Sequence, residues 1–282
     1  WETIHKEYKA KIALGLFLFF TVWWVIMHLL LESDHFLYHY YGVFYGIIAV
    51  WGAIWGIAIA RKWGGFKSIM GKALLMLSFG LLAQEFGQNA YSYYIFVLHV
   101  DIPYPSIGDI GFFGTIPFYI YGAYLLGKAA GVKFSLNSAK NKAQAFLIPA
   151  VMVAICYILF LRNYSFDLST PLTTFLTYGY PLGQAIYISI GILTYSLTRG
   201  ILGGVMKAKI LFLIFAFSAQ FLADYIFLFF QQSYYPGSPI DYLYTVAYFL
   251  MAIGIIQFET IYNKLRHTEQ YGCLFTNNGK NY

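Results

Sequence analysis

Eight apolar segments follow one another along the chain, with short polar turns between them. A helix needs about 20 apolar residues to cross the hydrocarbon core of a membrane. These runs lack the polar alternation of a barrel strand and are about twice as long as one, so strands are excluded. The segments are Ala10–Leu31, Leu37–Ala60, Ala73–Leu98, Asp109–Gly127, Ala145–Leu161, Leu172–Leu197, Ile210–Phe230 and Tyr242–Ile261. The pattern predicts an all-α integral membrane protein with eight transmembrane helices.

Basic residues gather at alternate ends of these segments. They precede the first segment (Lys6, Lys9, Lys11) and follow the second (Arg61, Lys62, Lys67, Lys72), the fourth (Lys128, Lys133, Lys140, Lys142), the sixth (Arg199, Lys207, Lys209) and the eighth (Lys264, Arg266, Lys280). Only Arg162 falls on the opposite side. Because Lys and Arg are retained on the cytoplasmic side of a membrane, we expect both termini in the cytoplasm.

Composition supports a membrane location. The chain is 60% hydrophobic and 11% charged, whereas soluble domains carry roughly a quarter charged residues. The net charge of +6 comes from the basic turns, so we expect the lipid bilayer as a partner and no nucleic acid. Cys156 lies in an apolar segment and Cys273 near the C-terminus, so no disulfide framework is implied.

The two halves of the chain share features in the same order. The third segment contains Ala83-Gln84 and leads into a Pro-Ser-x-x-Asp turn at 105–109, and the seventh contains Ala219-Gln220 and leads into a similar turn at 236–241. We therefore predict two tandem four-helix repeats of the parallel type, with an axis along the membrane normal. Residues 1–131 form the first repeat, 132–142 a cytoplasmic linker, 143–262 the second repeat and 263–282 a flexible cytoplasmic tail.

The serine and aspartate of each turn have the spacing of a helix cap. Ser106 and Ser238 are placed to cap the following helix, and Asp109 and Asp241 come three residues later. This is a capping box with Asp in place of Glu, and its carboxylate also faces the positive end of the helix dipole. We interpret these four residues as helix caps rather than ligand-binding groups.

Two stretches resemble a known family. Ile102–Asp109 (IPYPSIGD) followed by an aromatic-rich helix, and Tyr178–Gly183 (YGYPLG), are similar to motifs of the multi-pass sensory modules at the N-terminus of bacterial and archaeal diguanylate cyclases and histidine kinases. Gln184 stands where that family usually has Asp. The resemblance implies a prokaryotic inner-membrane sensor. Only about twenty residues follow the eighth segment, so it also implies either a missing output domain or a separate signalling partner.

Polar residues inside the predicted membrane segments mark a candidate site, because ionisable groups there are costly. Gln84, Glu85 and Gln88 lie in the third segment, and Gln220 and Asp224 share a face of the seventh. The repeat predicts that these two faces meet near the axis. They form either a ligand pocket or a hydrogen-bonded clamp between the halves.

Four histidines lie near the outer ends of the first three segments: His28, His35, His39 and His99. The i, i+4 pair of His35 and His39 is compatible with a shared divalent metal, to which Glu32 and Asp34 would add oxygen ligands. Exposed interfacial histidines are the plainer interpretation. We expect no cofactor.

These features together favour a sensory or receptor-like membrane module that signals to a cytoplasmic partner, with a homodimer as one arrangement. Sequence motifs of zinc proteases, phosphate-binding loops and nucleophile elbows are absent, so we do not expect an enzyme. A small-solute transporter with an axial polar site is an alternative, since parallel repeats also build transporters. An accessory subunit of a membrane complex is a further one.

Overall fold

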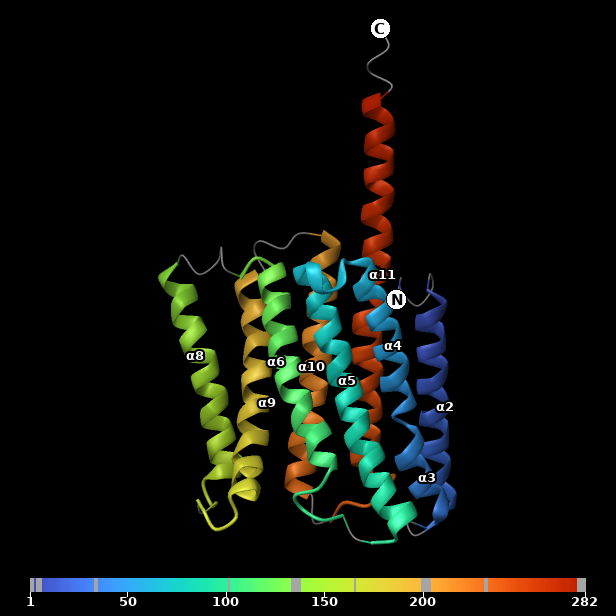
Figure 1. Ribbon diagram of the computed structural model, residues 1–282, viewed down its shortest axis with the longest axis vertical. Helices are drawn as coiled ribbons and strands as arrows, with labels where there is room; N and C mark the ends of the chain where they lie inside the picture. Colours follow the sequence, from blue (N-terminus) through green and yellow to red (C-terminus); the bar gives the residue numbers. More distant parts are fainter. Residues whose placement is uncertain are drawn as a thin grey trace.

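The computed structural model of the chain describes residues 3, 7–32, 35–100, 102–132, 138–164, 166–198, 204–230 and 233–277. All regular structure in these residues is helical (Figure 1). The elements are α2 (Tyr8–Leu30), α3 (Phe36–Phe44), α4 (Ile47–Lys62), η1 (Gly65–Lys67), α5 (Ile69–Tyr93), η2 (Tyr94–Leu98), α6 (Gly108–Ala129), α8 (Ala139–Cys156), η3 (Tyr157–Leu161), α9 (Pro171–Thr198), α10 (Gly204–Phe230) and α11 (Pro239–Asn277).

Seven helical stretches in the described residues are long and apolar enough to cross a membrane. Three of them join neighbouring elements, namely α3 with α4, α5 with η2, and α8 with η3. This finding confirms the predicted all-α, multi-pass membrane chain. The sixth predicted segment, Leu172–Leu197, is helical as part of α9, but α9 is not among the seven. Its many Thr, Tyr and Gly residues make it less apolar than its neighbours.

Six of the described helices form a closed ring in which each contacts the next, in the order α4, α5, α6, α9, α10, α11 and back to α4. The two remaining long helices lie outside this ring. Helix α2 packs against α4 and α11, and α8 packs against α9, at opposite sides of the bundle (Figure 1). The ring is therefore the part of the fold that can enclose a site.

Aromatic side chains fill the middle of the ring. Tyr119 of α6 meets Tyr187 of α9 and Phe217 of α10 edge to face, with ring centroids 5.8 and 5.4 Å apart. All three are fully buried, as is Tyr248 of α11. Edge-to-face pairs at this separation are favourable beyond the area they bury. The interior of the ring is thus a packed core at this level.

Helix α11 is the longest described helix. Its 39 residues extend roughly 58 Å at about 1.5 Å per residue, and its C-terminal part projects beyond the other helices (Figure 1). Residues 263–277, in the predicted flexible tail, belong to this helix, and 278–282 lie outside the described residues. The predicted linker 132–142 includes the start of α8 at Ala139, whose N-cap Ser138 accepts a hydrogen bond from the Asn141 amide.

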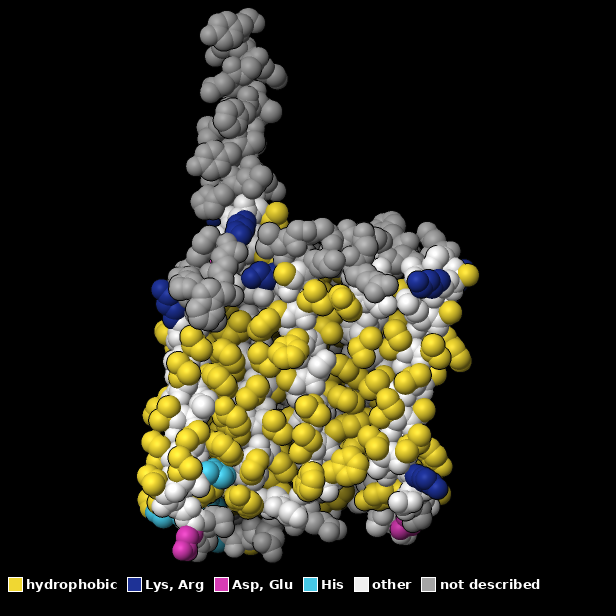
Figure 2. All heavy atoms as spheres, turned by 180° about the vertical axis from the view of Figure 1, so that it is seen from behind, with side chains coloured by type: hydrophobic (Ala, Val, Ile, Leu, Met, Phe, Trp, Pro, Cys, Tyr) yellow, Lys and Arg dark blue, Asp and Glu magenta, His cyan; other side chains and the backbone are white. Residues whose placement is uncertain are grey.

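Charged side chains are distributed unevenly between the two ends of the bundle. Figure 2 shows Lys and Arg mostly at the end from which α11 projects, and His with Asp and Glu at the opposite end, with an apolar belt between. At the projecting end, Glu259 of α11 pairs with Lys9 of α2 and Lys62 of α4. Glu259 and Lys9 are almost fully buried, so this ion-pair cluster ties three helices together.

Candidate functional site

A cavity of about 490 Å³ lies inside the ring, toward the end opposite the α11 projection. Five of the six ring helices contribute to its walls, together with η3 and the loops that precede α6, α9 and α11. Its polar lining residues are Gln84, Gln88, Tyr91, Tyr104, Asp109, Thr115, Tyr164, Thr177, Tyr180, Tyr187, Asp224, Tyr234, Asp241, Tyr244 and Tyr248. The volume lies within the range of small-molecule binding sites.

Asp109 lies in the first turn of α6 and accepts several hydrogen bonds. Its Oδ2 accepts from the Ser106 amide at 2.7 Å and from the Ser106 hydroxyl at 3.2 Å, while Oδ1 accepts from the Tyr180 hydroxyl at 2.7 Å. The Ser106 hydroxyl oxygen in turn accepts from the Gly108 amide. Ser106 and Asp109 thus bond to the turn before α6 as expected, although the residue that directly precedes the helix is Ile107. The Asp109 carboxylate also faces the cavity.

Asp241 occupies the corresponding place at the start of α11. Its Oδ2 accepts from the Gly237 amide at 2.6 Å, and the Tyr234 hydroxyl donates to its Oδ1 at 3.1 Å. Ser238 is buried, and its hydroxyl has no hydrogen-bond partner in the described part of the chain. At this turn the Asp241 side chain bonds to a backbone amide that precedes the helix. The Ser238 side chain does not cap the helix, although its spacing predicted that it would.

Asp224 of α10 is held by three donors. Its Oδ1 accepts from the Gln220 amide and the Tyr244 hydroxyl, both at 3.0 Å, and its Oδ2 accepts from the Tyr187 hydroxyl at 3.3 Å. The tyrosines come from α11 and α9. A carboxylate that receives only donated hydrogen bonds is solvated by them in its ionised form. The same holds for Asp109 and Asp241.

The carboxylates of the cavity have no basic neighbour in its walls. Among the described residues, the cavity lining includes no Lys, Arg or His. Both ion pairs that join two described residues involve Glu259, at the other end of the bundle. Buried carboxylates are costly without a compensating charge or strong hydrogen bonds. The cavity is therefore an acceptor-rich site.

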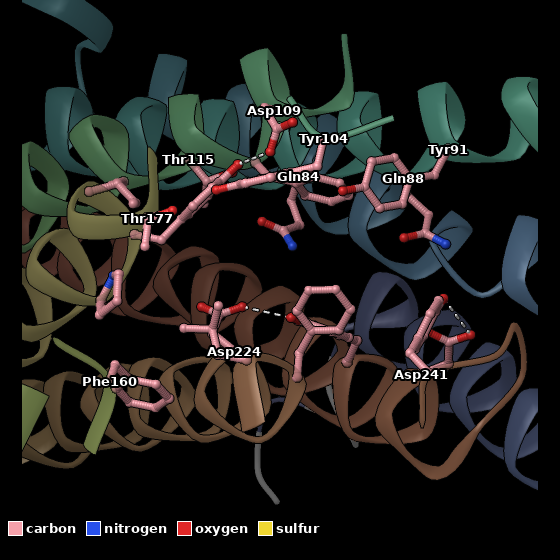
Figure 3. A pocket seen from close by; sticks show the side chains of 18 of the residues that line it. Gln84, Gln88, Tyr91, Tyr104, Asp109, Thr115, Phe160, Thr177, Asp224 and Asp241 are labelled. Carbon is pink, nitrogen blue, oxygen red and sulfur yellow. Dashed lines mark hydrogen bonds between the residues drawn. The ribbon is translucent and has the colours of Figure 1, made fainter. Parts of the chain in front are cut away.

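Three further groups contribute to the polar character of the walls. Gln84 is buried, and Figure 3 shows its amide extending into the space between the two walls. Gln88 donates a hydrogen bond from Nε2 to the Gly42 carbonyl at 2.8 Å. The Tyr248 hydroxyl is fully buried next to the Gln84 side chain, and no hydrogen bond of standard geometry reaches it from the described residues. A buried hydroxyl without a well-formed hydrogen bond is rare.

Two loop tyrosines that line the cavity, Tyr104 and Tyr234, keep their protons. Burial raises the pKa of the Tyr234 hydroxyl well above its ordinary value, and the nearby Asp241 carboxylate raises it further. Burial also raises the pKa of Tyr104, although to a smaller extent. Tyr234 therefore remains a hydrogen-bond donor to Asp241 across the physiological pH range.

The structure brings together some of the polar residues expected at the axis. Gln84, Gln88 and Asp224 line the cavity, whereas Gln220 reaches it only through its hydrogen bond to Asp224. Glu85 does not line it. Its Oε1 accepts from Asn89 at 3.0 Å, and its Oε2 lies so close to the Gly46 backbone that a Cβ there would be 1.7 Å away. Glu85 therefore belongs to the contact between α4 and α5.

Sequence analysis missed the tyrosines that donate to the carboxylates. Tyr180, Tyr187, Tyr234 and Tyr244 are four of 27 tyrosines, and aromatic residues are abundant at membrane interfaces generally. Their roles follow only from the ring arrangement, which brings α9 against α6 and α10 against both α9 and α11. The spacing between each tyrosine and its aspartate partner in the sequence does not predict that the two side chains meet.

The histidines expected near the outer ends do not form a metal site in the described part of the chain, which contains no group of three or more His, Cys, Asp or Glu placed to hold an ion. His28 bonds to the Trp24 carbonyl at 2.9 Å, and His35 accepts from the Leu37 amide as the cap of α3. His39 packs against Phe96. His99 ends η2 with a left-handed backbone. Asp34 lies outside the described residues.

No protein-family model matches the chain, and no curated protein or solved structure is significantly similar to it.

Proposed function

We propose that this chain is a membrane receptor module that binds a small polar ligand in the ring cavity and transmits occupancy through α11 to a cytoplasmic partner. The observation that carries the proposal is the position of α11. Its first turns supply Asp241, Tyr244 and Tyr248 to the cavity wall. Its last turns project beyond the bundle at the opposite end (Figure 1). One rigid element thus joins the site to the surface where a partner would bind.

We also propose that both termini face the cytoplasm and that α9 is an eighth membrane span. The gathering of Lys and Arg at the end from which α11 projects supports this orientation (Figure 2). Helix α9 completes the ring between α6 and α10, and its 28 residues are long enough to cross a bilayer. In this orientation the cavity lies toward the outer side of the membrane.

The proposed parallel repeat is supported by the contacts between helices. Exchanging the two halves replaces α4, α5 and α6 by α9, α10 and α11. Under this exchange the contact of α5 with α6 corresponds to that of α10 with α11, and the contact of α4 with α11 corresponds to that of α9 with α6. The cavity then lies on the pseudo-axis between the halves, where a change in their packing would alter it.

In this mechanism the ligand favours one packing of the two halves over the other, because a ligand that binds both equally shifts nothing. Figure 3 shows Asp109 and Gln84 on one wall and Asp224 and Asp241 on the opposite wall. A ligand that contacts both walls draws α6 toward α10 and α11. The buried cluster of Glu259 with Lys9 and Lys62 links α11 to α2 and α4 at the other end, so it is the contact that such a movement must strain or shift.

A thermal-unfolding screen of the purified chain against cationic, neutral and anionic small solutes tests the proposal. A receptor with this cavity gains stability from at least one solute, by about 2.7 kcal/mol at a hundredfold excess over Kd. The gain is expected to disappear in Asp224→Asn and to persist in Asp167→Asn, since Asp167 lies in an exposed loop away from the cavity. If a solute stabilises Asp224→Asn as much as Asp167→Asn, the cavity is not its binding site. If no solute stabilises the unsubstituted chain, the proposed ligand site is wrong.

A small-solute transporter is the second candidate, and Pro181 favours it. Pro181 lies inside α9 and lines the cavity. A proline within a helix removes one backbone hydrogen bond and favours a bend there. Uptake of the stabilising solute into proteoliposomes, lost in Asp224→Asn, would favour transport. Binding without uptake is the result expected of a receptor.

A further inference from the structure

We infer that the cavity ligand is an elongated organic polycation of the diamine or polyamine class, with ammonium groups separated by an alkyl chain. This inference rests on the proposed ligand-binding function and names the class of ligand for the same site. Three observations carry it: three carboxyl groups in walls without a described basic side chain, the separation of these groups around the cavity, and the chemistry of the walls between them.

The carboxyl groups of Asp109, Asp224 and Asp241 each accept a hydrogen bond from an N–H group. The donors are the Ser106 amide, the Gln220 side chain and the Gly237 amide, in that order. Tyrosine hydroxyls lie within hydrogen-bond distance of the same three groups. No basic side chain belongs to the described lining, so a cationic ligand supplies a positive charge that these walls lack.

The three carboxylates do not converge on one point. No three His, Cys, Asp or Glu side chains in the described residues are close enough to hold one metal ion. Figure 3 shows Asp109 on one wall, and Asp224 and Asp241 apart from each other on the opposite wall. A compact inorganic cation can reach only one of them at a time. A flexible molecule with two or more charged ends can reach two, within a cavity of about 490 Å³.

The walls between the carboxylates suit an alkylammonium chain. Tyrosine rings from α9 and α11, among them Tyr180 and Tyr244, border the cavity together with Phe112 and Phe227. Aromatic faces attract ammonium groups and accommodate methylene segments. The fully buried Tyr248 oxygen lies next to Gln84 and receives no hydrogen bond of standard geometry from the described residues, so it can accept one from an ammonium N–H. A single hydrated ion would leave this apolar area unused.

Isothermal titration of the full chain in detergent tests the inference with four probes: putrescine, n-butylamine, butanediol and succinate. Putrescine and n-butylamine share the four-carbon chain and differ in the second ammonium group. We expect putrescine to bind at least about tenfold more tightly than n-butylamine, since a charge-assisted hydrogen bond is worth about 1.5 kcal/mol or more. Butanediol and succinate should show no measurable binding.

Two cavity variants and one control locate the charges. Asp109→Asn and Asp224→Asn change opposite walls, and each should reduce the preference for putrescine over n-butylamine to less than about threefold. Asp167→Asn, outside the cavity, should leave it unchanged. The preference is a ratio measured on one protein sample, so partial loss of folded protein does not alter it. Circular dichroism and gel filtration confirm that each variant is folded before titration.

The outcomes separate the inference from the proposed function. Stronger binding of butanediol or succinate than of putrescine overturns the cationic ligand but leaves a ligand-binding cavity in place. Equal binding of putrescine and n-butylamine overturns the requirement for two charges. If none of the four probes binds while the thermal screen finds another solute, the diamine class is wrong. If the screen also finds none, the proposed function fails as well.

Discussion

Single residues carry most of the electrostatic organisation of this protein. The carboxylates of Asp109, Asp224 and Asp241 are solvated by tyrosine, serine and backbone donors. Glu259 is instead neutralised by two lysines. The carboxylates at one end of the bundle are therefore held by hydrogen bonds around a cavity, whereas the carboxylate at the other end is held by ion pairs.

Glu259→Gln should destabilise the protein, because it leaves the nearly buried Lys9 ammonium without its counterion. Removing one partner of a buried pair costs about 3 kcal/mol. Lys62 is 43% exposed in its side chain and can turn toward water at little cost. Thermal unfolding in detergent measures the effect, with Glu32→Gln at an exposed position as the control that should stay within about 0.5 kcal/mol.

The double variant Lys9→Met with Glu259→Gln provides the second half of this test. Replacing both members of a buried pair by groups of similar size recovers much of the lost stability, so the double variant should be more stable than Glu259→Gln alone. Equal loss in both proteins would show that the ion pair with Lys9 is not the source of the effect.

All three aspartates of the cavity were noticeable in the sequence, but only Asp224 was predicted to belong to a binding site. Asp224 stood out as a carboxylate in an apolar segment, and the spacing from Ser106 and Ser238 identified Asp109 and Asp241 as capping residues. The spacing contains no information on what else faces a capping carboxylate. That depends on which helix packs opposite, so the position of Asp109 and Asp241 in the cavity wall could not be predicted from the sequence. The same is true of the buried Ser238 hydroxyl, which has no hydrogen-bond partner in the described residues.

At the scale of elements, close contacts between helices depend on glycine. Helices α5 and α6 approach each other at Gly111, where a Cβ would lie 2.4 Å from the Ala83 carbonyl oxygen and 2.5 Å from the Gly87 amide nitrogen. Backbone atoms cannot move aside as a flexible side chain can. The α5 and α6 wall of the cavity, which carries Gln84 and Asp109, is positioned by this contact.

Gly111→Ala should therefore destabilise the protein by roughly 1–3 kcal/mol, the usual cost of overpacking. Gly114→Ala is the matched control, since it lies one turn further along the same helix and its Cβ would meet nothing within 4 Å. This control should be neutral or stabilising by up to about 1 kcal/mol, because alanine favours the helix. Thermal unfolding of both variants makes the comparison, and equal stability of the two would contradict the close α5–α6 contact.

The helices themselves were predictable because each needs only a long apolar run. The predicted segments, Leu172–Leu197 in α9 among them, begin and end within a few residues of most observed helices, but two features did not follow from hydropathy. The place of α9 between α6 and α10 depends on packing between helices, on which hydropathy contains no information. Helix α11 continues to Asn277 through a polar sequence whose helical state apolar patterning does not reveal.

At the scale of the whole molecule, helix α11 lines the cavity at one end of the bundle and projects from the other end (Figure 1). Within the bundle, helix α11 contacts α4, α10 and α2, so it cannot move without changing both the ring and its packing against α2. A ligand that closes the two walls of the cavity is expected to shift α11 relative to α4 and α5 at the end where Glu259 holds Lys62. The distance between α11 and the turn after α4 reports this shift directly.

The most direct test measures that distance by pulsed electron resonance with spin labels at Phe66→Cys and Leu265→Cys, two exposed positions, after Cys156→Ala and Cys273→Ser. The solute with the largest stabilising effect in the thermal screen is added at saturating concentration. The account predicts that the distance distribution shifts in this protein and does not shift when Asp224→Asn is also present. An unchanged distribution with the solute demonstrably bound would contradict transmission through α11.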